Sequence, residues 1–136
     1  MMENDTGAPR DNLGKKRRIM IVDDEEDICK IFKSGLERHG FAVDSFQDPI
    51  DALARYKPDF YDLLLIDIRM PRISGFELLR EILKVDPKVK TVFISATEVH
   101  TNEVTKALPQ GIKASIVKKP IPLKNLVKLV QDEILD

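Results

Sequence analysis

Short, unbroken runs of apolar residues constrain the fold of this chain more than any other feature of its sequence. A run that is apolar at nearly every position predicts a strand buried on both faces, which is the habit of parallel sheets. We predict such strands at residues 18–22, 62–66, 91–94 and 115–117. The segment 41–46 alternates apolar and polar residues and predicts a shorter, more exposed strand.

Helical patterns separate the predicted strands. Apolar residues recur at helical spacing in the segments 25–39, 48–57, 74–83, 102–108 and 123–135. In the first of these, Ile28, Ile31 and Phe32 mark the buried face, and Gly40 closes the helix. Strands that alternate with helices predict an α/β fold, here a doubly wound, five-stranded parallel sheet with five helices on both faces and right-handed crossovers.

The length of the chain, 136 residues, fits one compact domain with a modest tail. Residues 1–16 are polar and lack periodicity, so we predict a flexible N-terminal tail followed by a folded domain over 17–136. The basic run 15–18 could be a targeting or polyanion patch. Because it directly precedes a hydrophobic strand, we favour solvating charge at the strand entrance.

Composition excludes several function classes. The net charge of −1, the absence of Trp and the 6% aromatic content argue against direct nucleic-acid binding. No apolar run approaches the ~20 residues that a membrane span needs, and no secretory signal follows the basic stretch. A single cysteine, Cys29, excludes an internal disulfide and fits a reducing cytoplasm. Its apolar neighbours predict that Cys29 is a small packing residue.

Polar side chains occupy the carboxyl ends of four predicted strands, where open α/β sheets place their functional crevice. In chain order these residues are Asp23 and Asp24, Asp67, Ser95, and Lys118 with Lys119. Taken singly, an Asp after a strand is often a helix N-cap, a Ser a turn hydroxyl and a Lys a solvated charge. The ordered set predicts one site that combines carboxylates, a hydroxyl and an ammonium.

Three carboxylates in one partly desolvated crevice repel one another and need a countercharge. Mg²⁺ fits best, because it takes oxygen ligands from few carboxylates and keeps several waters, while the lack of nearby His or Cys disfavours zinc. Such a metal would hold phosphate oxygens against a carboxylate nucleophile, and Asp67 would then form an aspartyl phosphate. The hydroxyl of Ser95 and the ammonium of Lys119 would receive the phosphoryl oxygens.

The chain resembles the receiver domain of two-component response regulators from Arg17 to Leu135. The segments that carry the resemblance are 19–25 (IMIVDDE), 67–71 (DIRMP) with Gly75, 95–96 (SA) and 119–120 (KP). The resemblance implies a flavodoxin-like strand order, 2-1-3-4-5. It also implies a phosphoryl-accepting signalling switch of a two-component or phosphorelay system, which is not an enzyme and receives its phosphoryl group from a histidine kinase or a histidine phosphotransfer protein.

Site roles follow from the same resemblance. Asp67 is implied to be the phospho-acceptor, Ser95 the switch hydroxyl and Lys119 the lysine that pairs with the phosphoryl group. We choose Lys119 over Lys118 because Pro120 follows it. The implied metal ligands are Asp24, Asp67 and the backbone carbonyl of Arg69, with Asp23 acting mainly through water. Arg69 and Thr97 are implied to lie near the acceptor, where such positions tune water access.

One position departs from the family pattern. Where an aromatic side chain is usual, three residues before the lysine, this chain has Ile116, which is stiff at χ1 and lacks a hydroxyl. We therefore expect output through the fourth helix, fifth strand and fifth helix to use backbone shifts rather than a ring rotation. We further expect a cytoplasmic, stand-alone receiver without an output domain. It would act on a downstream protein target, either as a monomer or as a phosphorylation-linked dimer.

Two alternatives remain open. A Mg²⁺ phosphatase of the haloacid-dehalogenase type also uses an Asp at a strand end, but it needs a second Asp where this chain has Arg69. A phosphorylation-independent pseudo-receiver would act purely as an interaction module. Its usual mark is the loss of the acidic pair, the acceptor or the lysine, and this chain retains all of them.

Overall fold

The structure, a computed structural model, describes residues 14–135, apart from the side chain of Thr101. Most of the predicted tail, residues 1–13, therefore lies outside the described residues, as does residue 136. The five strands are β1 (Arg18–Val22), β2 (Ala42–Phe46), β3 (Leu63–Asp67), β4 (Thr91–Ser95) and β5 (Ser115–Lys118). The five helices are α1 (Glu26–Arg38), α2 (Pro49–Ala54), α3 (Gly75–Leu83), α4 (Thr101–Ala107) and α5 (Leu123–Leu135).

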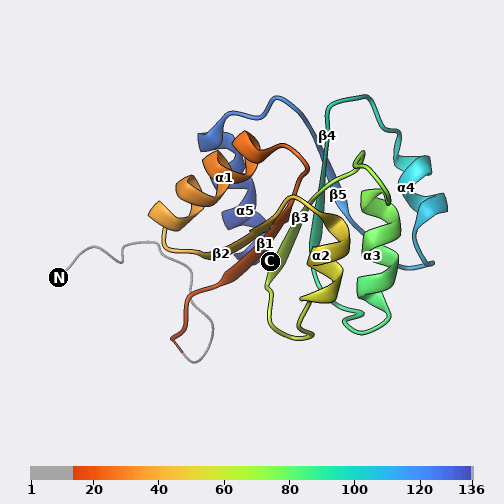
Figure 1. Ribbon diagram of the computed structural model, residues 1–136, viewed down its shortest axis with the longest axis horizontal. Coiled ribbons are helices and arrows are strands. Elements are labelled where there is room, and N and C mark those ends of the chain that lie inside the picture. The colour runs from red at the N-terminus through yellow and green to blue at the C-terminus, as the bar shows by residue number, and fades with distance from the viewer. Residues whose placement is uncertain (1–13, 136) are drawn as a thin grey trace.

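All strand pairs are parallel, and the strand order is β2-β1-β3-β4-β5. Figure 1 shows α1 and α5 on one face of the sheet and α2, α3 and α4 on the other. Every residue of β3 and β4 is buried, because helices cover both faces of these central strands. The predicted doubly wound fold and its strand order are confirmed.

Each face of the sheet packs its own apolar core. The side chains of Ile19, Ile21 and Leu65 point toward α1 and α5, while those of Met20, Leu64 and Ile66 point toward α2, α3 and α4. Successive residues of a strand face opposite sides of the sheet, so an unbroken apolar run supplies both cores at once. That is why the apolar runs located the strands from the sequence alone.

Two local predictions were wrong. Ile31 was assigned to the buried face of the first helix, but its side chain is 53% exposed. The second helix was predicted to reach residue 57, whereas α2 ends at Ala54 with Arg55 as its C-cap. Because Pro58 disfavours helical geometry in the residue before it, the chain leaves the helix earlier than the apolar pattern suggests.

Gly75 brings the start of α3 against the strand that carries Asp67. Its N–H donates to the carbonyl oxygen of Ile68 at 2.7 Å, which closes the loop between β3 and α3. A Cβ at this position would lie 2.5 Å from the carbonyl oxygen of Asp67 and 3.0 Å from the Cα of Ile68. Ser74 and Glu77 form a capping box that fixes the first turn of the helix.

Replacing Gly75 by Ala should lower the free energy of unfolding by about 2 kcal/mol, because the backbone beside it has no room to move. Gly35→Ala is the matched control, since the three heavy atoms nearest to a Cβ there all belong to the side chain of Leu123. That side chain can change rotamer, and alanine favours the helix, so a loss below about 1 kcal/mol is expected. Urea unfolding measures both variants, and equal losses would contradict the proposed backbone conflict.

Candidate functional site

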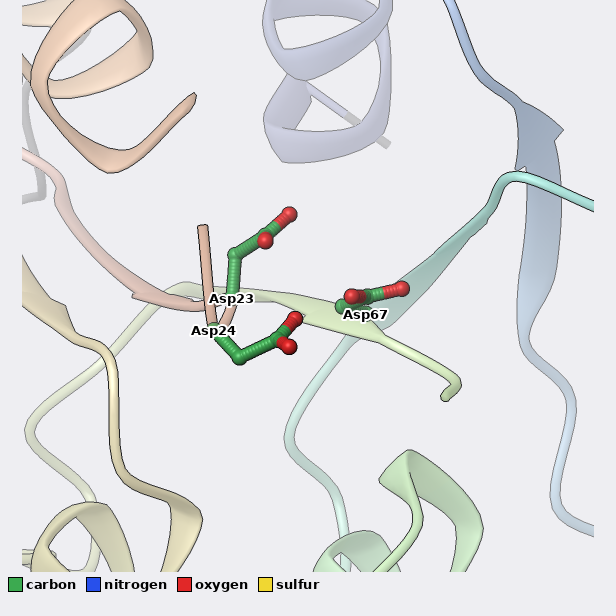
Figure 2. A group of neighbouring side chains, drawn as sticks. All are labelled: Asp23, Asp24 and Asp67. Carbon is green, nitrogen blue, oxygen red and sulfur yellow. The ribbon is translucent and has the colours of Figure 1, made fainter. Parts of the chain in front are cut away.

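Three carboxylates meet at the carboxyl edge of the sheet. Asp23 and Asp24 directly follow β1, and Asp67 is the last residue of β3. Figure 2 shows their side chains converging, and one oxygen from each lies within 4.8 Å of the others. The side chains of Asp23 and Asp67 are buried, whereas Asp24 is exposed to solvent. The carboxylate cluster predicted from strand ends is present in the fold.

Lys119 supplies the positive charge of this cluster. Its Nζ lies 2.9 Å from Asp23 Oδ2, 3.6 Å from Asp67 Oδ2 and 3.0 Å from Glu25 Oε1. The peptide bond that follows, to Pro120, is cis. Lys118 instead approaches the exposed Glu98, at 3.7 Å. Of the two adjacent lysines, the structure therefore brings Lys119 to the carboxylates.

Glu25 is a member of the site to which the sequence analysis gave no site role, although it lies in the segment 19–25 that carries the family resemblance. It is the N-cap residue of α1, and its N–H donates to Asp23 Oδ1 at 2.9 Å. Its own carboxylate shares the ammonium of Lys119 with Asp23. Its sequence position could have indicated this role, because Glu25 directly follows Asp23 and Asp24 at the carboxyl end of β1.

Burial and like charge shift the ionisation of the cluster. Burial and then the neighbouring charge of Asp23 raise the pKa of Asp67 to about 7, although Lys119 partly offsets them. Burial also raises the pKa of Asp23, despite its hydrogen bond with Lys119. Burial acts to lower the pKa of Lys119, but the bonds to Asp23 and Glu25 outweigh it and raise that pKa. The site thus holds more negative charge than one ammonium balances.

A hard divalent cation fits this excess. Asp23, Asp24 and Asp67 offer only oxygen ligands, which Mg²⁺ prefers, and the cluster lies at an accessible edge through the exposed Asp24. Cys29 helps to hold the backbone of Asp23 in place, because its Sγ donates to the carbonyl oxygen of Asp23 at 3.2 Å. Burial raises the pKa of this thiol to about 11, so Cys29 is a packing residue, as predicted.

Ser95 ends β4 and is almost completely buried. Its hydroxyl donates to the carbonyl oxygen of Thr97 at 2.9 Å and accepts from the N–H of Thr97 at 3.2 Å. Arg69, in the loop after β3, is exposed and donates from Nε to the hydroxyl of Thr97 at 2.9 Å. The predicted switch hydroxyl therefore lies at the carboxyl edge of the sheet, as expected. In this structure it is hydrogen-bonded to Thr97, in the loop that follows it.

Comparison of the sequence with known proteins identifies a family and several relatives. Residues 19–131 match the family described as the response regulator receiver domain. The chain is 30% identical to the response regulator receiver protein CpdR of Brucella abortus over 115 residues, 85% of this chain and 94% of that protein. It is 34% identical to the chemotaxis protein CheY of Treponema pallidum, covering 86% of this chain and 82% of that protein. Other relatives are longer: the chain spans 44% of the transcriptional regulatory protein TrcR of Mycobacterium tuberculosis.

Solved structures of receiver and response regulator proteins also match this chain. A CheY-like receiver domain from Methanospirillum hungatei superposes with a TM-score of 0.75 at 28% identity, over 87% of this chain and 93% of that one. The response regulator TrrA of Thermotoga maritima, solved in complex with Mg²⁺ and BeF, has a TM-score of 0.72 at 29% identity, over 86% of this chain and 98% of that one. Among residues 14–135 no helix is long and apolar enough to cross a membrane.

Lys119→Gln should lower the free energy of unfolding by about 3 kcal/mol in the absence of divalent cations, because it leaves the buried Asp23 without a countercharge. Lys118→Gln is the matched control and should change stability by less than about 0.5 kcal/mol, since its partner Glu98 is exposed. Chemical denaturation in chelator measures both. Similar losses in the two variants would show that Lys119 does not balance the cluster.

The raised pKa of Asp67 makes stability depend on pH. Between its usual value of 3.8 and about 7, the folded protein keeps a proton that the unfolded chain has released. The free energy of unfolding should therefore fall as pH rises through this window, by at most about 1.4 kcal/mol per pH unit from this group. Asp67→Asn should flatten this slope and be more stable than the wild type at pH 7.

The control for this titration is Asp51→Asn, which removes an exposed carboxylate that pairs only with Arg55 among the described residues. Its stability should follow the wild-type pH profile. Thermal unfolding at several pH values, without divalent cations, measures all three proteins. If Asp67→Asn keeps the full wild-type slope, burial of Asp67 is not its cause.

Proposed function

Since this chain belongs to the response regulator receiver domain family of two-component signalling, we propose that its phosphoryl acceptor is Asp67. The chain is a signalling switch rather than an enzyme. The observation that carries the proposal is the burial of the Asp67 carboxylate between Asp23, Asp24 and the ammonium of Lys119. A carboxylate kept there without a full countercharge is poised to react with an electrophilic phosphorus and to hold the product.

The proposed donor is the phosphohistidine of a histidine kinase or of a histidine phosphotransfer protein. One carboxylate oxygen of Asp67 forms the new O–P bond as the N–P bond of the donor breaks, and the imidazole leaves with the electron pair of that bond. Because Asp67 reacts as the anion, the proximity of Lys119 favours its reactive form. The ammonium also lies where it would pair with the new phosphoryl oxygens.

Mg²⁺ is the cofactor that this donor set fits. We propose that Asp24, Asp67 and the backbone carbonyl of Arg69 hold it, with Asp23 acting through water. When bound, Mg²⁺ neutralises charge that develops on the phosphoryl oxygens. Support comes from the oxygen-only cluster and from the similar protein TrrA, whose structure contains Mg²⁺ with BeF.

Output would pass from Ser95 to the face formed by α4, β5 and α5. The hydroxyl of Ser95 would turn to the phosphoryl group and draw the loop 96–100 with it. Ile116 lines a cavity of about 550 Å³ together with Val99 and Val104, so the structure leaves space beneath α4 for this loop to move. We propose that the face then contacts a downstream protein in the cytoplasm, or a second copy of the chain.

Phosphorylation itself is tested with Mg²⁺ and acetyl phosphate, a small donor that needs no partner protein. The wild type should gain one phosphoryl group of 80 Da, labile to hydroxylamine, and Asp67→Asn should gain none because it lacks the nucleophilic oxygen. Intact-protein mass spectrometry measures the gain. Omission of Mg²⁺ should abolish it as well.

Asp51→Asn controls for a general loss of carboxylate and should be labelled like the wild type. A wild type that is never labelled would support the pseudo-receiver alternative. Sustained release of phosphate from phosphate esters, proportional to enzyme and time, would instead support the phosphatase alternative. Labelling that survives in Asp67→Asn would place the acceptor elsewhere.

A further inference from the structure

A chain of hydrogen bonds joins the loop after β3 to the loop after β4. Arg69 Nε donates to Thr97 Oγ1 at 2.9 Å, across 28 positions of sequence. Thr97 in turn holds Ser95 through both of its backbone groups, at 2.9 Å and 3.2 Å. The Ser95 and Thr97 hydroxyl oxygens are also 3.4 Å apart. Three side chains at the edge of the acidic cluster thus form one connected unit.

We propose that Arg69 is a positioning residue that latches the unphosphorylated arrangement, by holding Thr97 and, through it, the hydroxyl of Ser95. The inference rests on the proposed function and adds to it the side chain that sets how readily the switch moves. Its role is separate from that of the Arg69 backbone carbonyl, since the guanidinium points to Thr97.

The latch restrains Ser95 because the single hydroxyl hydrogen of Ser95 is already used in a bond to Thr97. A hydroxyl has one hydrogen to donate, and Ser95 donates it to the carbonyl oxygen of Thr97. Ser95 therefore has no hydrogen for a phosphoryl oxygen until this bond breaks. Any contact that keeps Thr97 in place opposes that exchange, and the Arg69 bond is such a contact from outside the loop.

The charge of Arg69 explains how phosphorylation would break its bond to Thr97. Within residues 14–135 no carboxylate forms an ion pair with this guanidinium, and its hydrogen-bond partner is the neutral hydroxyl of Thr97. A phosphoryl group on Asp67, two residues away in sequence, would offer anionic oxygens, to which arginine bonds more strongly and with two donors. Phosphorylation would then withdraw Arg69 from Thr97 while also attracting Ser95, so one event frees both ends of the unit.

Thr97→Val is the sharpest test, because it removes the hydroxyl that Arg69 holds while preserving shape, backbone groups and the guanidinium itself. The probe is beryllium fluoride with Mg²⁺, which stands in for the phosphoryl group. Loss of the latch should tighten its apparent affinity about two- to five-fold, since a contact present only in the resting state is gone. The amide NMR shifts of residues 95–98, recorded before the probe is added, should move toward their bound values.

Thr97→Ser is the matched control. It keeps an acceptor hydroxyl for Arg69 and should retain the wild-type affinity and amide shifts. Arg69→Met removes the donor and keeps the backbone carbonyl, so it should move the same amides in the same direction. Because both changes break one bond, the double variant should move them no further than Thr97→Val alone.

Equal affinities and amide shifts in Thr97→Val and Thr97→Ser would overturn the latch. Weaker binding in Thr97→Val, or amide shifts that add in the double variant, would overturn it too. Failure of the proposed function is distinct, because the wild type itself would then show no saturable change with beryllium fluoride.

Discussion

The structure depends on an uneven balance of charge at the carboxyl edge of its sheet. Asp23 and Asp67 are buried at the ends of neighbouring strands, and Lys119 reaches both of them from the end of β5. In the sheet, β4 lies between β5 and β3, and both β4 and β3 lie between β5 and β1, so the lysine reaches past one strand to Asp67 and past two to Asp23. The interaction fastens the last third of the chain to its first strand, and it still leaves a negative surplus. Burial together with that surplus explains the raised pKa of Asp67, and the surplus explains the fit to a hard cation.

The sequence predicted the parts of this molecule that short, repeated patterns determine. The run 63–66 located a central strand, and its end located Asp67, because burial on both faces requires an apolar residue at each position. Asp23, Ser95 and the pair Lys118 and Lys119 followed from the same rule applied to the other strands, and the choice of Lys119 came from the family resemblance. Strand order came from family resemblance, since apolar patterns do not say which strands are neighbours.

Other features depend on distances between segments that no local pattern contains. Glu25 reads as a helix start until Lys119, 94 positions away, is found within 3.0 Å of it. The bond from Arg69 to Thr97 depends on the conformations of two separate loops. Ile31 fits the helical period of α1 and is exposed all the same, because it lies beside the stripe of α1 that is buried, which contains Phe32 and Leu36. Position in the fold, rather than residue type, determines these outcomes.

The close approach at Gly75 makes the two sides of the acceptor strand's end unequal in packing. A helix start that lies on the backbone of Asp67, with its own N–H bonded to Ile68, has no slack in which to follow a change at the acceptor. The loop beyond Ser95 is exposed and has the cavity lined by Ile116 beside it. α3 therefore begins on backbone that is in contact with Asp67, whereas the loop that leads into α4 borders the cavity. The two helices are thus held unequally, and a movement at the end of β3 meets less resistance on the side of α4 than on the side of α3.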